Sequence, residues 1–170
     1  MARRTSPFLL LLLLPLACAL AAPAGAVTQN ASVNASVSRP LTLAAQQNLD
    51  LGTITLMPGT WSGATAGISR SGVVTCAANL VCAGAPTVAR FKVTGSNKMV
   101  VLITAPDATL VNQADPSQKL TLVIDNPGRL TLTSSGEPGN NFNLGGSLTL
   151  SSTTPAGTYS GTLQVTVDYQ

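Results

Sequence analysis

The chain has 170 residues, of which 45% are apolar, 4% aromatic and 9% charged, and none is histidine. The charged fraction is far below the roughly 25% of an average soluble domain and the apolar fraction is ordinary, which excludes a disordered polyion and a coiled coil. Without histidine, and with six acidic residues in all, the sequence offers little for acid–base catalysis or metal binding. We therefore expect no enzymatic activity, no metal site and no cofactor.

The N-terminal segment has the three parts of a secretory signal peptide. Two arginines near the start carry positive charge, residues 8–22 form an apolar run, and residues 24–26 (Ala-Gly-Ala) offer a small-residue cleavage site. The run is shorter than the roughly 20 residues that a membrane-spanning helix needs. We therefore expect residues 1–26 to be removed during export, through the periplasm to the cell surface or beyond. A retained anchor and a lipid attached at Cys18 are the alternatives.

Removing this segment changes both the charge and the cysteine count. Seven basic and six acidic residues remain, a net charge of +1, and the basic residues are scattered, so nucleic-acid binding is not expected. Two cysteines remain, Cys76 and Cys82. An even count in an exported chain predicts one disulfide, and two thiols without histidine are too few ligands for a zinc site.

Between the signal peptide and the first strand lies an N-terminal extension, residues 27–40. Its apolar side chains are small and fall on one face of an extended chain, with Asn and Ser on the other; they are Ala31, Val33, Ala35 and Val37. Such a strand buries little by itself and needs a sheet edge to pair with. That edge belongs either to its own domain, as an ordinary first strand, or to a neighbouring copy, by strand donation.

Along the rest of the chain the apolar residues alternate with polar ones, and no helical period appears. The apolar runs are separated by Gly, Pro and Asn turn signals and fall at residues 49–56, 73–76, 88–93, 99–103, 120–124, 130–132, 142–150 and 163–169. Seven to nine short strands of this kind are typical of an antiparallel, immunoglobulin-like β-sandwich. Because no linker divides it, we expect residues 41–170 to form one domain.

The end of the chain carries a more specific pattern. Leu163, Val165, Val167 and Tyr169 alternate with polar residues, the tyrosine is penultimate, and Gly157 is the fourteenth residue from the end. This combination resembles the C-terminal motif of chaperone–usher pilus subunits. In that family the terminal strand pairs with a periplasmic chaperone and later borders the groove that receives a neighbour's N-terminal strand. The resemblance implies an assembly strand here.

Further segments resemble a bacterial secreted family known as domain of unknown function 4402, often regarded as pilin-like. They are residues 49–52, 91–95, 103–106, 142–146, 157–162 and 165–169. The family usually has Phe where Leu51 stands, and ordinary pilins place their disulfide near the first strands rather than in a central loop. The resemblance implies a pilin-like sandwich and offers no catalytic residue.

The sequence therefore predicts a structural subunit of a bacterial pilus or fimbria, whose partners are further copies or related subunits, a periplasmic chaperone and an outer-membrane usher. The alternative is a secreted, adhesin-like domain that binds surfaces and does not polymerise. Trp61, in the Gly/Ser/Thr-rich residues 58–63, is its only candidate sugar platform, although a single loop tryptophan more often packs as a lid. A hydrolase lacks support, because no G-x-S-x-G motif and no suitable base occur.

Overall fold

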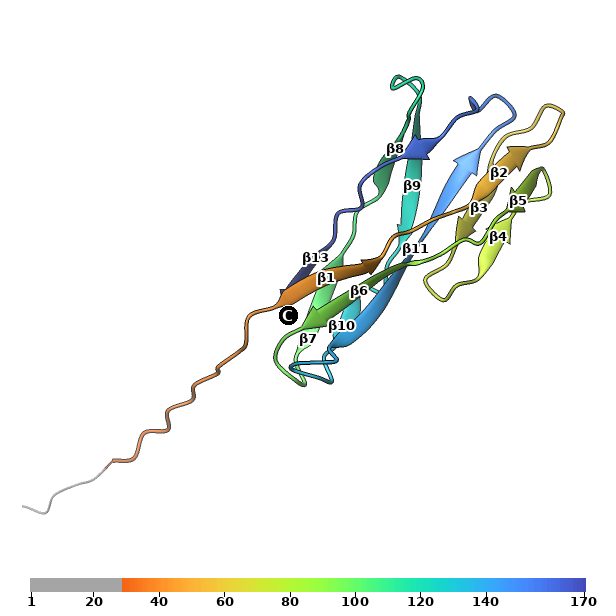
Figure 1. Cartoon of the computed structure of the whole chain (residues 1–170). Helices are drawn as coiled ribbons and strands as arrows, with labels where there is room; N and C mark the ends of the chain where they lie inside the picture. Colours follow the sequence, from red (N-terminus) through yellow and green to blue (C-terminus); the bar gives the residue numbers. More distant parts are fainter. Residues whose placement is uncertain (1–28) are drawn as a thin grey trace, which may run out of the picture. The chain divides into compact units, whose positions relative to one another are not determined.

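The computed structural model describes residues 29–170, and the regular structure in this part of the chain is entirely β-strand (Figure 1). The predicted signal peptide, with Val27 and Thr28 of the extension, lies outside the described residues. All strand pairs are antiparallel, which confirms the expected all-β, antiparallel structure. The strands are β1 (Thr42–Gln47), β2 (Thr53–Leu56), β3 (Ala64–Ile68), β4 (Val74–Cys76), β5 (Leu80–Ala83), β6 (Ala89–Thr94), β7 (Val100–Thr104), β8 (Ala108–Asn112), β9 (Lys119–Asp125), β10 (Arg129–Thr131), β11 (Asn140–Leu150), β12 (Tyr159–Ser160) and β13 (Thr166–Tyr169).

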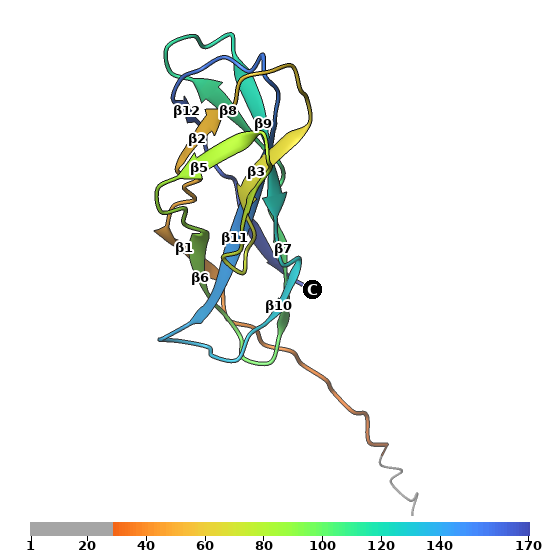
Figure 2. The ribbon, with the colours of Figure 1, turned by 90° about the vertical axis from the view of Figure 1, so that its right-hand side faces the viewer.

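The largest sheet is built around β11. Its strand order is β1-β6-β11-β9-β8-β12, with β3 and β4 attached beside β11. The first half of β11 pairs with β6, and the second half pairs with β9 on one edge and β3 on the other. This sheet curls. Strands β2 to β5 lie toward one end of the domain, and β1, β6, β7, β10 and β13 lie toward the other (Figures 1 and 2).

A smaller sheet, with the order β10-β7-β13, faces the β1-β6-β11 part of the large sheet. The chain passes repeatedly between the two sheets. Strands β7, β10 and β13 lie in the small sheet, and their neighbours in sequence, β8, β9 and β12, lie in the large one. The expected count of seven to nine strands is therefore wrong. The described residues contain thirteen strands, and five of them lie outside the predicted apolar runs: β1, β3, β5, β8 and β12.

The first apolar cluster fills the space between these two sheets. It contains the inward-facing residues of β6, β7 and β11, among them Val93, Val101 and Leu144, which are fully buried. Phe91 and Phe142 are direct cross-strand partners and stack with their ring centroids 5.5 Å apart. Each large apolar side chain buried here contributes roughly 1.5–3 kcal/mol, so this cluster is a main source of stability.

A second apolar cluster lies at the other end, between the large sheet and the two-stranded ribbon β2–β5. Its buried members come mainly from β3, β9 and β11 and from Leu80 at the start of β5. The predicted disulfide is present: Cys76 on β4 is bonded to Cys82 on β5, with their Cα atoms 6.1 Å apart. The bond therefore ties the ribbon to the large sheet. Residues 36–170 form one compact unit.

Candidate functional site

The C-terminal strand lies against the first apolar cluster, as its alternation predicts. The inward side chains are half-buried and pack on that cluster; they are Leu163, Val165, Val167 and Tyr169. The intervening side chains are exposed; they are Thr162, Gln164, Thr166 and Asp168. This stretch therefore presents one apolar face to the core and one polar face to solvent.

The strand β13 is paired along only one edge within the described residues. It pairs with β7, and the Gln170 N–H donates to the Val100 carbonyl at 3.0 Å. Backbone groups alternate between the two edges of an antiparallel strand, so those of Val167 and Tyr169 point toward the open edge. Residues 161–165, just before β13, belong to no strand and form no backbone–backbone hydrogen bond with the described chain. The open edge therefore runs from residue 161 to residue 169.

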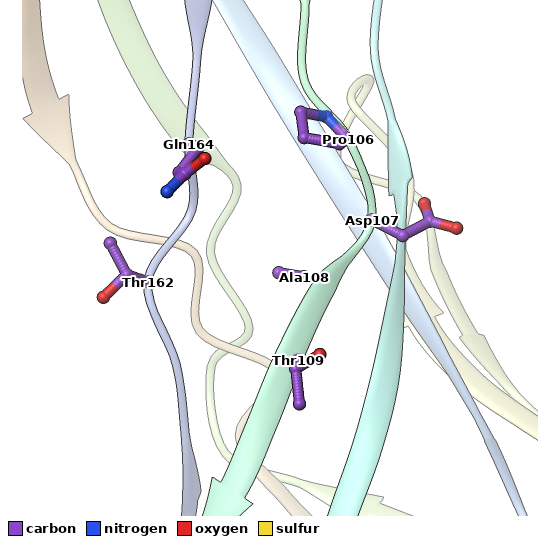
Figure 3. Close-up of a pocket in the computed structure, with 6 residues that line it drawn as sticks. All are labelled: Pro106, Asp107, Ala108, Thr109, Thr162 and Gln164. Atoms are coloured by element: carbon purple, nitrogen blue, oxygen red, sulfur yellow. The ribbon is translucent and has the colours of Figure 1, made fainter.

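A shallow groove of about 340 Å³ opens beside residues 161–165 (Figure 3). Thr162 and Gln164 line one side, and residues 106–109, at the start of β8, line the other. The carboxylate of Asp107 accepts a hydrogen bond from the Ile124 N–H at 3.0 Å, so it is engaged in the fold. The groove lies between these two segments, on the side of residues 161–165 where β7 and β8 run, and it offers hydroxyl, amide and backbone groups.

Gly157 lies against the buried side chain of Asn112. Its φ of +154° is unfavourable for other residues, and a Cβ there would collide with the Asn112 amide. That amide donates to the Ala156 carbonyl at 3.2 Å and accepts from the Ala114 N–H at 2.9 Å, so it joins two connections. This contact alone requires a glycine at position 157. Sequence reasoning missed Asn112, because an asparagine at a strand end resembles any other turn residue.

The hydroxyl of Tyr169 is hydrogen-bonded within the domain. It donates to the Arg39 carbonyl at 2.7 Å and accepts from the Ser96 N–H at 2.6 Å. Arg39 lies at the end of the N-terminal extension and Ser96 in the turn between β6 and β7. The penultimate tyrosine therefore joins the last strand to the beginning of the domain. Neither partner carries a signal in the sequence that would identify it.

The described part of the extension has no secondary structure. Residues 29–41 belong to no strand, and the side chains of residues 29–40 are exposed. Val33 and Val37 have 90% and 93% of their surface accessible, respectively. The apolar face predicted from Ala31, Val33, Ala35 and Val37 is thus unburied, in contrast to the inward side chains of residues 163–169.

Trp61 packs as a lid over the second apolar cluster. Its side chain is half-buried on that cluster, and its indole N–H donates to the Met57 carbonyl at 3.0 Å. Its backbone carbonyl accepts a hydrogen bond from the Ser152 N–H at 3.1 Å. The ring and its donor are therefore both engaged in the fold, as expected for a lid.

Charged side chains of the described residues form two ion pairs and one local hydrogen-bonded turn. The two ion pairs are Arg70–Asp125 and Lys92–Glu137, and pairs with exposed partners of this kind contribute little to stability. The pKa of Asp115 is lowered because the Ser117 hydroxyl and N–H hydrogen-bond to its carboxylate. Among residues 29–170 no three His, Cys, Asp or Glu residues group together as metal ligands. No helix in this range is long and apolar enough to cross a membrane.

The chain matches one family model, described as a domain of unknown function (DUF4402), over residues 41–169. The match covers all thirteen strands, from β1 to β13. No curated protein and no solved structure matches the chain significantly.

Proposed function

This chain belongs to the domain-of-unknown-function family DUF4402, and on that premise we propose that it is a structural subunit of a bacterial surface pilus or fimbria. Subunits assemble by β-strand donation: the N-terminal extension of one copy completes a sheet of the next. Such an arrangement is head-to-tail, and head-to-tail contacts that do not close a ring generate filaments.

The observation that carries this proposal is the open edge at residues 161–169. An unpaired strand edge presents backbone donors and acceptors that attract another strand. Here the edge is backed by four half-buried apolar side chains that pack on the first cluster. A strand added at this edge would gain both backbone hydrogen bonds and burial of its own apolar face.

The N-terminal extension matches that edge in length and period. Its four apolar positions, 31, 33, 35 and 37, have the same two-residue spacing as positions 163, 165, 167 and 169. Each set spans roughly 20 Å at about 3.3 Å per residue. The two-residue period also fixes the register, because a slip by one residue would turn every apolar side chain outward.

In this proposal the domain is an immunoglobulin-like, pilin-like sandwich that lacks one strand. Before assembly a periplasmic chaperone covers the open edge, and an outer-membrane usher passes the subunit outward to the cell surface. Export through a cleaved signal peptide supplies the oxidising compartment in which the Cys76–Cys82 disulfide forms. The partners of the mature subunit are thus neighbouring copies or related subunits.

The test is assembly of the mature chain with one charge placed on either face of the extension. Val33→Asp places a carboxylate on the apolar face and should abolish filaments seen by electron microscopy and size-exclusion chromatography. Asn34→Asp adds the same charge to the polar face and should leave assembly intact. Both variants should keep the wild-type thermal unfolding temperature, because both side chains are exposed in the single chain.

Two results would contradict the proposal. One is equal assembly of both variants. The other is a chain that never forms filaments and that loses several kcal/mol of stability when residues 27–38 are deleted, since the extension would then be the domain's own first strand. A non-polymerising chain would favour the adhesin-like alternative, with a binding surface that does not depend on Trp61.

A further inference from the structure

We infer that Tyr169 is a positioning residue for strand donation, because its hydroxyl holds the root of the N-terminal extension at the end of β13. We call the set formed by Tyr169, Ser96 and Arg39 the root clamp. Its contacts are independent of the proposed function, whereas its effect on donation rests on that function.

Three hydrogen bonds close the root clamp into a ring. The Tyr169 hydroxyl donates to the Arg39 carbonyl at 2.7 Å and accepts from the Ser96 N–H at 2.6 Å. The Arg39 N–H donates to the Ser96 hydroxyl oxygen at 2.6 Å. Both backbone polar groups of Arg39 are therefore held by side chains from distant parts of the domain.

The surroundings restrict the root further. Gly95 is buried, and a Cβ there would lie 2.5 Å from the Tyr169 hydroxyl and 2.7 Å from a methyl group of Leu41, so the clamp needs a residue without a side chain at this position. Pro40 follows Arg39, and a residue before proline is confined to extended conformations. The extension therefore leaves the domain from a fixed point.

This fixed point determines how the extension could meet the open edge. The extension runs toward Arg39, which is held beside Tyr169, and β13 also runs toward Tyr169. An extension folded back onto its own β13 would therefore pair parallel to it, and Arg39 could not join the ladder because its backbone groups are occupied. A strand from a second copy is free to enter antiparallel, the pairing that is more stable per residue. The clamp thus favours donation to a second copy.

Amide hydrogen exchange tests the clamp in the mature, unassembled chain. Tyr169→Phe keeps the ring but removes the hydroxyl, so the Ser96 amide should exchange roughly two- to twelvefold faster, as expected for one lost hydrogen bond. Tyr159→Phe is the matched control, since its hydroxyl also donates to a carbonyl, that of Pro155 at 2.8 Å, and it should leave Ser96 unchanged. Ser96→Ala removes the hydroxyl that accepts from the Arg39 N–H, so the Arg39 amide should exchange faster by a similar factor. Unchanged exchange at Ser96 in Tyr169→Phe overturns the clamp.

A mixing experiment separates a role in donation from a role in the acceptor edge. A heavy-isotope-labelled full-length chain carrying Val33→Asp serves as an acceptor that cannot donate, and mass spectrometry measures its capture by an unlabelled donor. Tyr169→Phe should slow capture roughly two- to twelvefold when it is in the donor, and by clearly less when it is in the labelled acceptor, where the ring that packs on the first apolar cluster is kept. An effect confined to the acceptor overturns the positioning role. Failure of the wild-type chain to assemble overturns both the proposed function and the donor role. Hydrogen exchange of the Ser96 amide still shows, independently, whether the root clamp exists.

Discussion

Replacing Tyr169 with alanine should destabilise the domain far more than replacing its neighbour Asp168. The ring of Tyr169 is half-buried on the first apolar cluster, and losing that burial costs about 2 kcal/mol. Its hydroxyl makes two hydrogen bonds, at about 1 kcal/mol each. The expected loss is therefore about 4 kcal/mol. The Asp168 side chain is exposed, and changes at such sites stay within about 0.5 kcal/mol.

Thermal unfolding followed by circular dichroism measures the difference. At roughly 3 °C per kcal/mol for a domain of this size, Tyr169→Ala should lower the unfolding temperature by about 12 °C. Tyr169→Phe, which keeps the ring, should lower it by about half as much, and Asp168→Ala should leave it nearly unchanged. Equal unfolding temperatures for Tyr169→Ala and Asp168→Ala would refute the assignment of inward and outward faces in the last strand.

Two further predictions concern the disulfide and the turn before β12. Native mass spectrometry of the exported protein should find no free thiol, and reducing the Cys76–Cys82 bond should cost about 2 kcal/mol; two alkylatable cysteines in native material would contradict it. Gly157→Ala should cost about 1–3 kcal/mol in urea unfolding, because the new methyl group collides with Asn112. In a chain that already carries Asn112→Ala, the same Gly157→Ala change should cost less stability. An equal cost in both backgrounds would argue against the contact.

Strands with one face on the core and one in solvent could be predicted from the sequence. In β6 and β9, and in residues 163–169, large apolar and polar side chains alternate, so the period identifies both the strand and its inner face. By contrast β3, Ala-Thr-Ala-Gly-Ile, is built mostly from small residues, and its alternation is correspondingly faint. The apolar run in residues 142–150 contains Gly145 and Gly146, and β11 passes through both glycines without interruption.

The candidate site was predicted in part. The inward and outward faces of residues 163–169 follow from a local pattern, and the disulfide at the other end of the domain follows from the cysteine count. The partners of Tyr169 do not, because Ser96 and Arg39 are 73 and 130 residues away in the sequence and a hydrogen bond to a backbone group leaves no mark on residue type. The same holds for Gly157, whose need for a glycine comes from a buried amide on another strand.

The central position of β11 has a consequence for how the protein is made. This strand joins β3, β6 and β9, yet it is synthesised after all three of them, and its pairing of Leu150 with Ala64 joins residues far apart in the sequence. Contacts between such distant residues form slowly, and synthesis proceeds from the N-terminus. Strands β3, β6 and β9 therefore remain without their pairing partner until β11 has been synthesised. With only 9% charged residues, the unpaired strands carry few charges that would prevent pairing with other chains, so they are prone to aggregate until the sheet closes.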